Sequence, residues 1–126
     1  MKDRSEKAIM NASLVEVSSL PETLAWRNNT GMAWQGIQRP VRKGQTLIVQ
    51  AGMVVLMEAR PITFGLPGSG DILGVNAGRA FALEAKTLTG KQHETQLRFQ
   101  AAFERAGGLY GVFRSEEEAL AILGRG

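Results

Sequence analysis

A tight turn at Asn76-Ala77-Gly78, between two apolar segments, constrains the fold of this chain more than any other feature. Asn and Gly tolerate the left-handed backbone conformation that a short hairpin connection needs. The sequence therefore predicts two antiparallel strands, from Asp71 to Val75 and from Arg79 to Thr87. An acid begins this hairpin, and an acid and a lysine lie near its end, although the segment otherwise looks like part of a core.

Helices are predicted on both sides of this hairpin in the sequence. Apolar residues recur at helical spacing within residues 3–19, and Phe99 and Phe103 lie four residues apart in a helix predicted over residues 92–106. Ser115, with Glu118 three residues later, forms a capping box that predicts the start of a last helix.

The remaining strands complete the predicted architecture. Strands are expected over residues 24–28 and 109–113, and residues 45–58 are expected to form one bent strand or a hairpin. Residues 34–44 are basic and are expected to be irregular. The order of helices and strands predicts an α/β fold with a mixed β-sheet flanked by helices. At 126 residues, the chain is expected to form a single domain over residues 1–126.

The composition excludes several kinds of chemistry. The chain has no cysteine and one histidine, His93, so a zinc site of the usual His and Cys type is excluded. Any metal must be held by oxygen, which favours Mg²⁺ or Mn²⁺. No apolar run is long enough to span a membrane, and the N-terminus does not look like a signal peptide, so a cytoplasmic protein is expected. The net charge of +3 permits a nucleic-acid partner without requiring one.

Two acids are expected to face each other across the hairpin. Side chains alternate along a strand, so Glu84 and Lys86 share one face. A register that places Asp71 opposite Glu84 would bring the two Cβ atoms to about 5 Å. Two carboxylates that close repel each other unless a cation lies between them, and a divalent metal is such a cation. The backbone carbonyl of Ala85 can add a third oxygen ligand.

Each of these residues also has a simpler interpretation. Charged residues alternate on many exposed strand faces, so Glu84 and Lys86 could be solvated. Gln96 shares a helical stripe with two phenylalanines, and its amide could either meet a polar partner or cap a backbone group. Glu6 lies on the expected core-facing side of the first helix, where it could serve the site or favour the helix dipole.

Several segments that together span nearly the whole chain carry a resemblance to a known family. They are Ser5-Glu6-Lys7-Ala8-Ile9, Trp26-Arg27-Asn28-Asn29-Thr30-Gly31, residues 65–72, residues 78–87, residues 89–96 and residues 106–115. The chain resembles the virus-type replication-repair nuclease (VRR-NUC) domains of the PD-(D/E)xK superfamily. An acid, a Glu-x-Lys motif and a downstream Gln follow one another in that family, as they do here.

The resemblance implies a restriction-endonuclease-like core and a Mg²⁺- or Mn²⁺-dependent endodeoxyribonuclease. Asp71 and Glu84 would then be metal ligands, Lys86 the catalytic lysine, and Gln96 and Glu6 supporting residues. Compact single-domain members of this family are similar to phage or bacterial enzymes that act as homodimers. The substrates of those enzymes are branched DNA such as four-way junctions. One departure is plain, because a glycine precedes Asp71 where the family usually has proline. That change loosens the loop without removing a ligand.

Basic residues outside this motif could contact DNA phosphates, although such residues are more often merely solvated. His93 could cap a helix or contact a phosphate, and the two tryptophans could stack on bases or belong to the core. Residues 45–58 are expected to form subunit contacts or a substrate surface. The basic residues that could bind DNA phosphates are Arg27, Arg39, Arg42, Lys43, Lys91 and Arg98, of which the first five are the candidate DNA-binding residues.

Two other functions remain open on the sequence alone. A nuclease fold can become a structure-selective DNA-binding module without turnover. A purely structural or protein-binding domain would have no metal site and no electrostatic contact with DNA.

Overall fold

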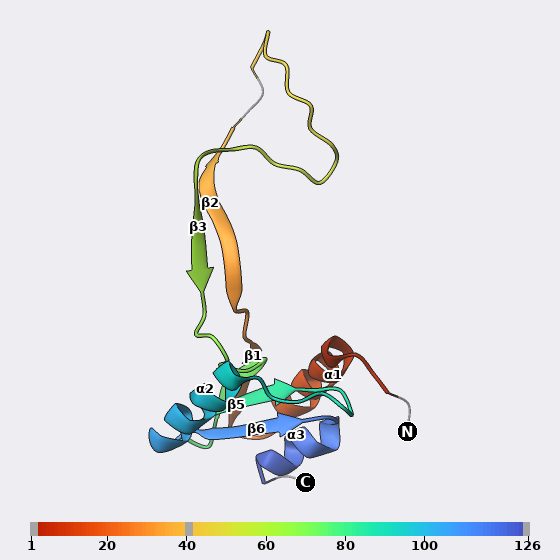
Figure 1. Ribbon diagram of the computed structural model, residues 1–126. Helices are drawn as coiled ribbons and strands as arrows, with labels where there is room; N and C mark the ends of the chain where they lie inside the picture. Colours follow the sequence, from red (N-terminus) through yellow and green to blue (C-terminus); the bar gives the residue numbers. More distant parts are fainter. Residues whose placement is uncertain (1–2, 40–41, 125–126) are drawn as a thin grey trace. The chain divides into compact units, whose positions relative to one another are not determined.

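The computed structural model describes residues 3–39 and 42–124, which divide into two units. We call residues 3–30 with 65–124 the sheet unit, and residues 31–64 the hairpin unit. Figure 1 shows the elements of both units along the chain. In order, they are α1 (Glu6–Ser18), β1 (Thr23–Arg27), β2 (Gly31–Gln38), β3 (Leu56–Phe64), β4 (Ile72–Asn76), β5 (Arg79–Ala85), α2 (Glu94–Arg105), β6 (Leu109–Phe113) and α3 (Glu116–Ile122).

The sheet unit is a mixed four-stranded sheet flanked by helices, which confirms the predicted α/β architecture at this level. The strand order is β1-β4-β5-β6, in which β5 pairs antiparallel with β4 and parallel with β6. The predicted hairpin is therefore the centre of the sheet. Its predicted register is also confirmed, because Ile72 lies opposite Leu83 and the turn residues connect Asn76 to Arg79.

The core lies between one face of this sheet and the helices α1 and α3. Ile9 and Val17 of α1 pack with Leu83 and Phe113 of the central strands, and all four are almost fully buried. Burial of apolar side chains on this scale is the main stabilising term of such a fold. Helix α2 lies on the opposite face, because its Gln96 reaches Glu84, whose side chain alternates with that of Leu83.

The predicted helix boundaries are close to the observed ones. Ser5 caps α1 by accepting a hydrogen bond from the backbone N–H of Ala8, and Ser115 caps α3 by accepting one from Glu118. These caps satisfy backbone donors that have no partner within the helix. None of the helices among the described residues is long and apolar enough to cross a membrane.

The hairpin unit contradicts two sequence predictions. The segment over residues 34–44, predicted to be irregular, contains most of β2, whereas β3 begins only at Leu56 and residues 45–55 form no regular strand. β2 pairs antiparallel with β3, and a bulge lies between Gln35 and Ile37. A Cβ at Gly36 would lie only 2.9 Å from the Met57 carbonyl oxygen. Strand formation here follows this cross-strand pairing more closely than residue propensity, which is why the β-branched residues misled the prediction.

The loop before β4 packs closely on the start of α2, and substitution there should be costly. Gly68 has φ of +80°, and a Cβ on it would lie 2.3 Å from the Thr95 carbonyl oxygen. Gly107 has a similar φ of +97° but open space around it. We expect Gly68→Ala to lower the free energy of unfolding by roughly 1–3 kcal/mol more than Gly107→Ala, because only Gly68→Ala adds overpacking to the φ penalty. Urea unfolding of both variants measures this; equal losses would contradict it.

Candidate active site

Asp71 is fixed to strand β5 by its backbone and by its side chain. It directly precedes β4, and its backbone N–H donates to the Leu83 carbonyl oxygen at 2.8 Å. The backbone N–H of Ala85 donates to Asp71 Oδ2, also at 2.8 Å. The carboxylate is therefore held over the end of β5, next to Glu84.

Glu84 is a buried carboxylate, since its residue is only 6% exposed. Gln96 Nε2 donates to Glu84 Oε1 at 2.8 Å, and Gln96 Oε1 accepts from the backbone N–H of His93 at 2.8 Å. The sequence left two roles open for the Gln96 amide, a polar partner or a cap on a backbone group. The amide has both roles, because it bonds Glu84 and caps the start of α2. The buried position of Glu84 excludes the solvated strand face that its spacing with Lys86 left open.

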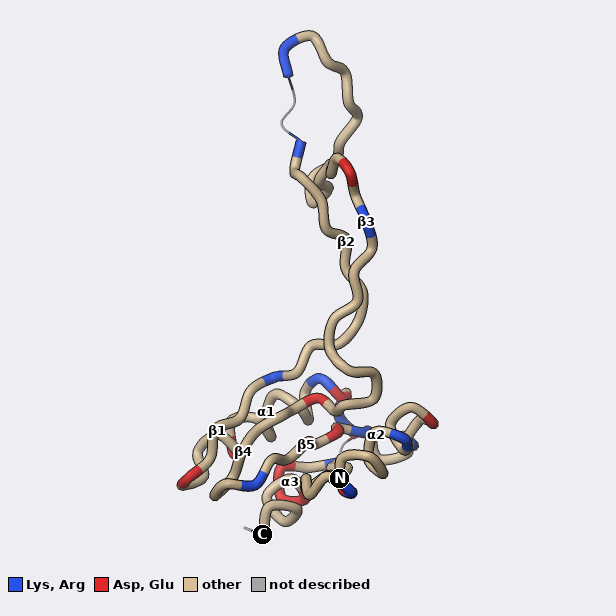
Figure 2. Tube along the Cα trace, turned by 90° about the vertical axis from the view of Figure 1, so that its left-hand side faces the viewer, with Lys and Arg blue, Asp and Glu red and all other residues tan. Residues whose placement is uncertain are grey.

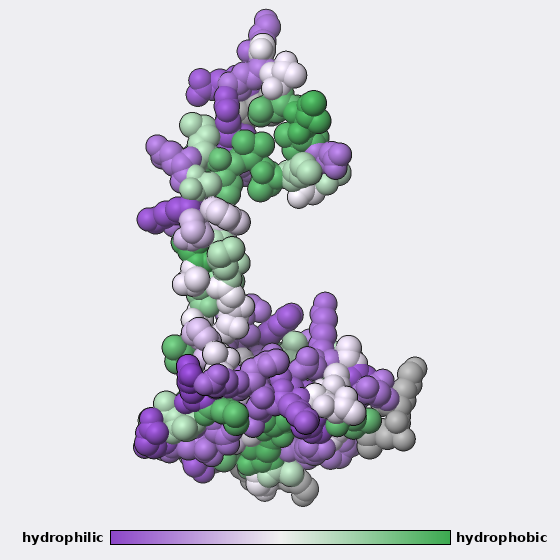
Figure 3. Space-filling model, viewed as in Figure 1, coloured by the Kyte–Doolittle hydropathy of each residue, from purple (hydrophilic) through white to green (hydrophobic). Residues whose placement is uncertain are grey.

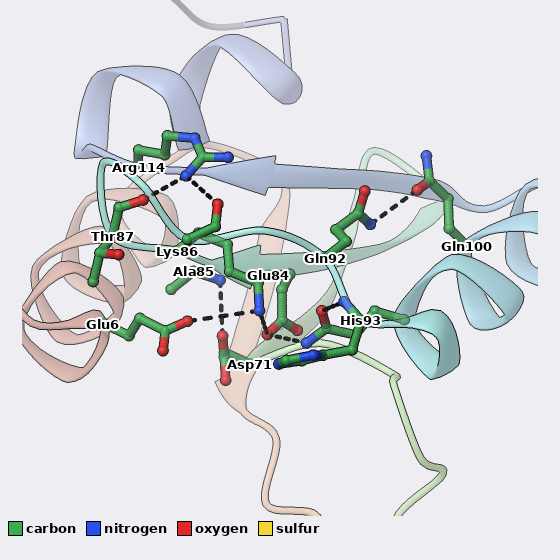
Figure 4. A network of polar contacts seen from close by, with 12 residues as sticks. Glu6, Asp71, Glu84, Ala85, Lys86, Thr87, Gln92, His93, Gln100 and Arg114 are labelled. Carbon is green, nitrogen blue, oxygen red and sulfur yellow. Dashed lines mark hydrogen bonds and ion pairs between the residues drawn. The ribbon is translucent and has the colours of Figure 1, made fainter.

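Lys86 lies between two carboxylates and is 4% exposed. Its Nζ lies 3.9 Å from Glu84 Oε1 and 3.8 Å from Glu6 Oε1. Glu6 is the first residue of α1, and about half of its side chain is exposed. It therefore occupies the first turn, where an acid favours the helix dipole, and also faces the lysine. Figure 4 shows Glu6 from α1, Asp71 from the residue before β4, and Glu84 and Lys86 from the end of β5 converging.

The electrostatics of Glu84 are unusual for a glutamate. Burial and then the nearby Asp71 carboxylate raise its pKa to about 8, against a smaller opposing effect of Lys86. Removing a carboxylate from water disfavours its charged form, and a second carboxylate disfavours it further. One lysine shared with Glu6 does not offset both effects. In the absence of a further cation, Glu84 therefore holds its proton up to a higher pH than an ordinary glutamate.

This raised pKa predicts how stability depends on pH. In the metal-free protein, the pKa of Glu84 is about 8 in the folded state and 4.5, its usual value, in the unfolded chain. The folded state therefore binds the proton more tightly. Its stabilising protonation is complete below pH 4.5 and is lost as the pH rises through 8. We expect the free energy of unfolding in EDTA to fall over this window, by up to about 1.4 kcal/mol per pH unit. Glu84→Gln should flatten the profile in urea titrations, and parallel profiles for the two proteins would contradict the assignment.

The oxygen atoms of this cluster fit a divalent cation. Asp71 Oδ2 accepts from Ala85 and Glu84 Oε1 accepts from Gln96, which leaves Asp71 Oδ1 and Glu84 Oε2 as the oxygens that could bind a cation. The carbonyl of Ala85 points to the same side of the strand as its N–H, toward Asp71. Hard oxygen donors of this kind suit Mg²⁺ or Mn²⁺, which complete their coordination with water.

The described residues add no larger cluster of ligands to the site. Among residues 3–39 and 42–124, no group of three or more His, Asp or Glu side chains is arranged to hold a metal. The groups that could hold a metal are thus two carboxylates and one main-chain carbonyl, those of Asp71, Glu84 and Ala85.

The carboxylates open into a polar pocket of about 420 Å³ within the sheet unit. Lys7 of α1, Arg27 at the end of β1 and His93 before α2 line it beside the acids. Of the predicted DNA-binding residues, Arg27 is the one that lines this pocket. Lys91 is exposed in the irregular segment before α2, and Arg39, Arg42 and Lys43 lie in the hairpin unit.

Sequence reasoning missed the residues that hold the loops around the site. Asn28 Nδ2 donates to Ser69 Oγ at 2.7 Å and to the Gly70 carbonyl oxygen at 2.9 Å, and its backbone N–H donates to the Asp71 carbonyl oxygen. The sequence identified Asn28 only as the end of an expected strand and as part of a segment that carries the family resemblance. These bonds tie the end of β1 to the loop that carries Asp71.

Arg114 makes an equivalent contact on the other side of the site. Its guanidinium donates to the carbonyl oxygens of Thr87 and Gly90, in the segment that joins Lys86 to His93 (Figure 4). Neither Asn28 nor Arg114 follows a recognisable spacing, because each bonds main-chain atoms of a distant segment.

Gly70, where the resembled family usually has proline, adopts a conformation closed to proline. Its φ is +100°, whereas the proline ring holds φ near −65°. A Cβ at this position would also lie 3.0 Å from the Leu83 carbonyl oxygen. The loop before Asp71 is therefore built around glycine in this chain, and it still delivers the carboxylate to β5.

Comparison with known proteins adds no family. No family model matches the sequence, and no curated protein matches it significantly.

Proposed function

We propose that this chain is a Mg²⁺- or Mn²⁺-dependent DNA endonuclease with a PD-(D/E)xK core like that of VRR-NUC domains. The observation that carries the proposal is the burial of Glu84 beside both Asp71 and Lys86 at one end of the central strands. Carboxylates with strongly perturbed pKa values that line a pocket are typical of functional sites. The order of acid, Glu-x-Lys and Gln in the sequence supports the same reaction class.

The metal would be held by Asp71 and Glu84 with the Ala85 carbonyl. When bound, it supplies Lewis-acid stabilisation of a phosphate oxygen and lowers the pKa of a bound water. The residues of the chain supply everything else in the reaction, namely binding of the DNA backbone, orientation of the attacking water and stabilisation of the developing charge.

Lys86 is the proposed catalytic lysine. Its ammonium lies at the rim of the carboxylate pair, where it can orient a water or donate to the developing negative charge on the phosphate. Glu6 shares this ammonium from the opposite side and limits its movement. Gln96 fixes the orientation of Glu84 from the start of α2. Glu6 and Gln96 are thus positioning residues in this proposal.

Backbone phosphates would bind along the pocket wall. Lys7, Arg27 and His93 line the pocket opposite or beside the carboxylates, and Lys91 lies near the start of α2. The lysine and arginine side chains among these residues neutralise phosphates that flank the bond to be cut. The preferred substrate in this proposal is branched DNA, and the enzyme is a homodimer, because two related subunits give the paired cuts that a two-fold four-way junction needs.

A substrate panel tests this function. Labelled four-way junction, flap, single-stranded and duplex DNA are incubated with the protein in Mn²⁺, and its mass is measured by light scattering. We expect paired cuts in the junction, at a higher rate than in linear duplex, from a particle of two chains. Equal rates on all substrates would remove the structure selectivity. Tight junction binding without cutting in any metal would instead support the non-catalytic binding module.

A further inference from the structure

The hairpin unit is a two-stranded ribbon of the kind that needs a partner. β2 and β3 pair along most of their length, and no third strand joins them among the described residues. An isolated two-stranded hairpin is only marginally stable in water. Its two strands of eight and nine residues extend to roughly 26–30 Å at about 3.3 Å per residue.

The hairpin unit carries the entire net charge of the protein. It contains four of the fifteen Lys and Arg residues and one of the twelve Asp and Glu residues, a net charge of +3. The chain as a whole also has a net charge of +3, so the eleven basic and eleven acidic residues elsewhere balance. Figure 2 shows the blue positions of the hairpin unit with a single red one. The basic residues are Arg39, Arg42, Lys43 and Arg60.

Large apolar side chains are exposed over the same unit. Ten of the seventeen exposed large hydrophobic residues of the described chain lie in these 34 residues. Figure 3 shows green, hydrophobic surface over part of this unit. Trp34 on β2 is 60% exposed and Ile48 is 93% exposed. An apolar surface of this size usually marks a binding surface. Besides Trp34 and Ile48, the exposed large hydrophobic residues of the hairpin unit are Met32, Ile37, Leu47, Val49, Met53, Val54, Met57 and Phe64.

We infer that the hairpin unit is a β-ribbon that enters the major groove of duplex DNA, an inference that rests on the proposed function for its ligand. The major groove is about 12 Å wide and admits a two-stranded ribbon. Arg42 and Lys43, whose residues are exposed, neutralise backbone phosphates, while apolar side chains contact sugars and thymine methyl groups.

Charge favours DNA over a second copy of the chain as the occupant. A symmetric contact between two copies would repeat the same basic residues on both sides. Like charges that meet across an interface are costly, whereas each phosphate of DNA offsets one of them. Gln35 also accepts hydrogen bonds from the Arg60 guanidinium across the ribbon, which keeps that cation on one face of it.

The salt dependence of binding tests this inference without requiring cleavage. Binding of labelled duplex DNA is measured in EDTA over a range of KCl concentrations, for wild type and for the double variant Arg42→Gln/Lys43→Gln. Loss of two phosphate contacts should reduce the slope of log K against log salt by about 1.8 and weaken binding roughly tenfold at moderate salt. The matched control is Arg79→Gln/Arg105→Gln, which removes the same charge from exposed positions at the start of β5 and the end of α2 and should keep the wild-type slope.

Each outcome separates this inference from the proposed function. If the wild type cuts DNA and Arg42→Gln/Lys43→Gln has an unchanged slope, the ribbon inference is wrong. The proposed nuclease function is then unaffected. If the slope falls as expected in the double variant but the wild type cuts nothing, the result supports the ribbon inference and contradicts the proposed nuclease function. If Ile48→Ser/Val54→Ser converts a two-chain particle to one chain while the slope of Arg42→Gln/Lys43→Gln is unchanged, the unit is a contact between copies and the inference is wrong.

Discussion

Glu84→Gln should remove metal binding and metal-dependent cleavage while leaving the fold intact. The amide keeps the size of the side chain and an oxygen that can accept the hydrogen bond from Gln96, but it removes the charge that would hold the metal. Metal ions contribute several kcal/mol to such reactions, so we expect the cleavage rate to fall about a thousandfold or more. Calorimetric titration with Mn²⁺ and a single-turnover cleavage assay measure the two losses.

Stability should change in the opposite direction to activity in this variant. Because burial and Asp71 disfavour the charged form of Glu84, the metal-free variant should be more stable than wild type at pH 8 and above. Glu104→Gln is the matched control, since Glu104 is exposed on α2 and far from the carboxylate pair in the fold. A Glu84→Gln protein that binds Mn²⁺ and cuts within a few-fold of wild type would contradict the assigned ligand.

Lys86→Met should separate cleavage from metal binding. Methionine retains much of the aliphatic length of lysine in this buried position, but it removes the ammonium shared by Glu84 and Glu6. We expect the rate constant of the chemical step to fall about a hundredfold to a thousandfold, as for the loss of one donor to developing charge. Mn²⁺ affinity should stay the same or rise, because a competing cation has gone from beside the carboxylates.

Lys86→Met should differ from Glu84→Gln in one respect, because it should lose cleavage while it keeps Mn²⁺ binding. Arg105→Met, at the exposed end of α2, controls for loss of a positive charge. Loss of Mn²⁺ binding in Lys86→Met would place the lysine in the support of the metal site, and an unchanged cleavage rate would remove it from the chemistry.

The sequence was sufficient for the parts of the fold that follow from local signals. The hairpin from β4 to β5, its register, the α2 helix and the Ser115 cap each depend on residues close together in the chain. Strand alternation and the hairpin register predicted that Asp71, Glu84 and Lys86 lie together, whereas the place of Gln96 beside them was implied only by the family resemblance.

What lay beyond the sequence depends on contacts between distant segments. Alternation places Glu84 and Lys86 on one face, but it does not say that this face is covered, so their deep burial could not be predicted. Asn28 and Arg114 hold loops through main-chain oxygens, for which no spacing exists. The hairpin unit was misjudged because residues 45–55 have high strand propensity but no strand to pair with.

Cleavage of labelled four-way junction DNA by the wild-type protein in Mg²⁺, in Mn²⁺ and in EDTA, beside Glu84→Gln, tests the central claim most directly. The account predicts cutting in either metal, none in EDTA, recovery when excess metal is restored, and none by Glu84→Gln under any condition. Cutting that persists in EDTA or in Glu84→Gln, or a folded wild-type protein that cuts nothing in either metal, would contradict it.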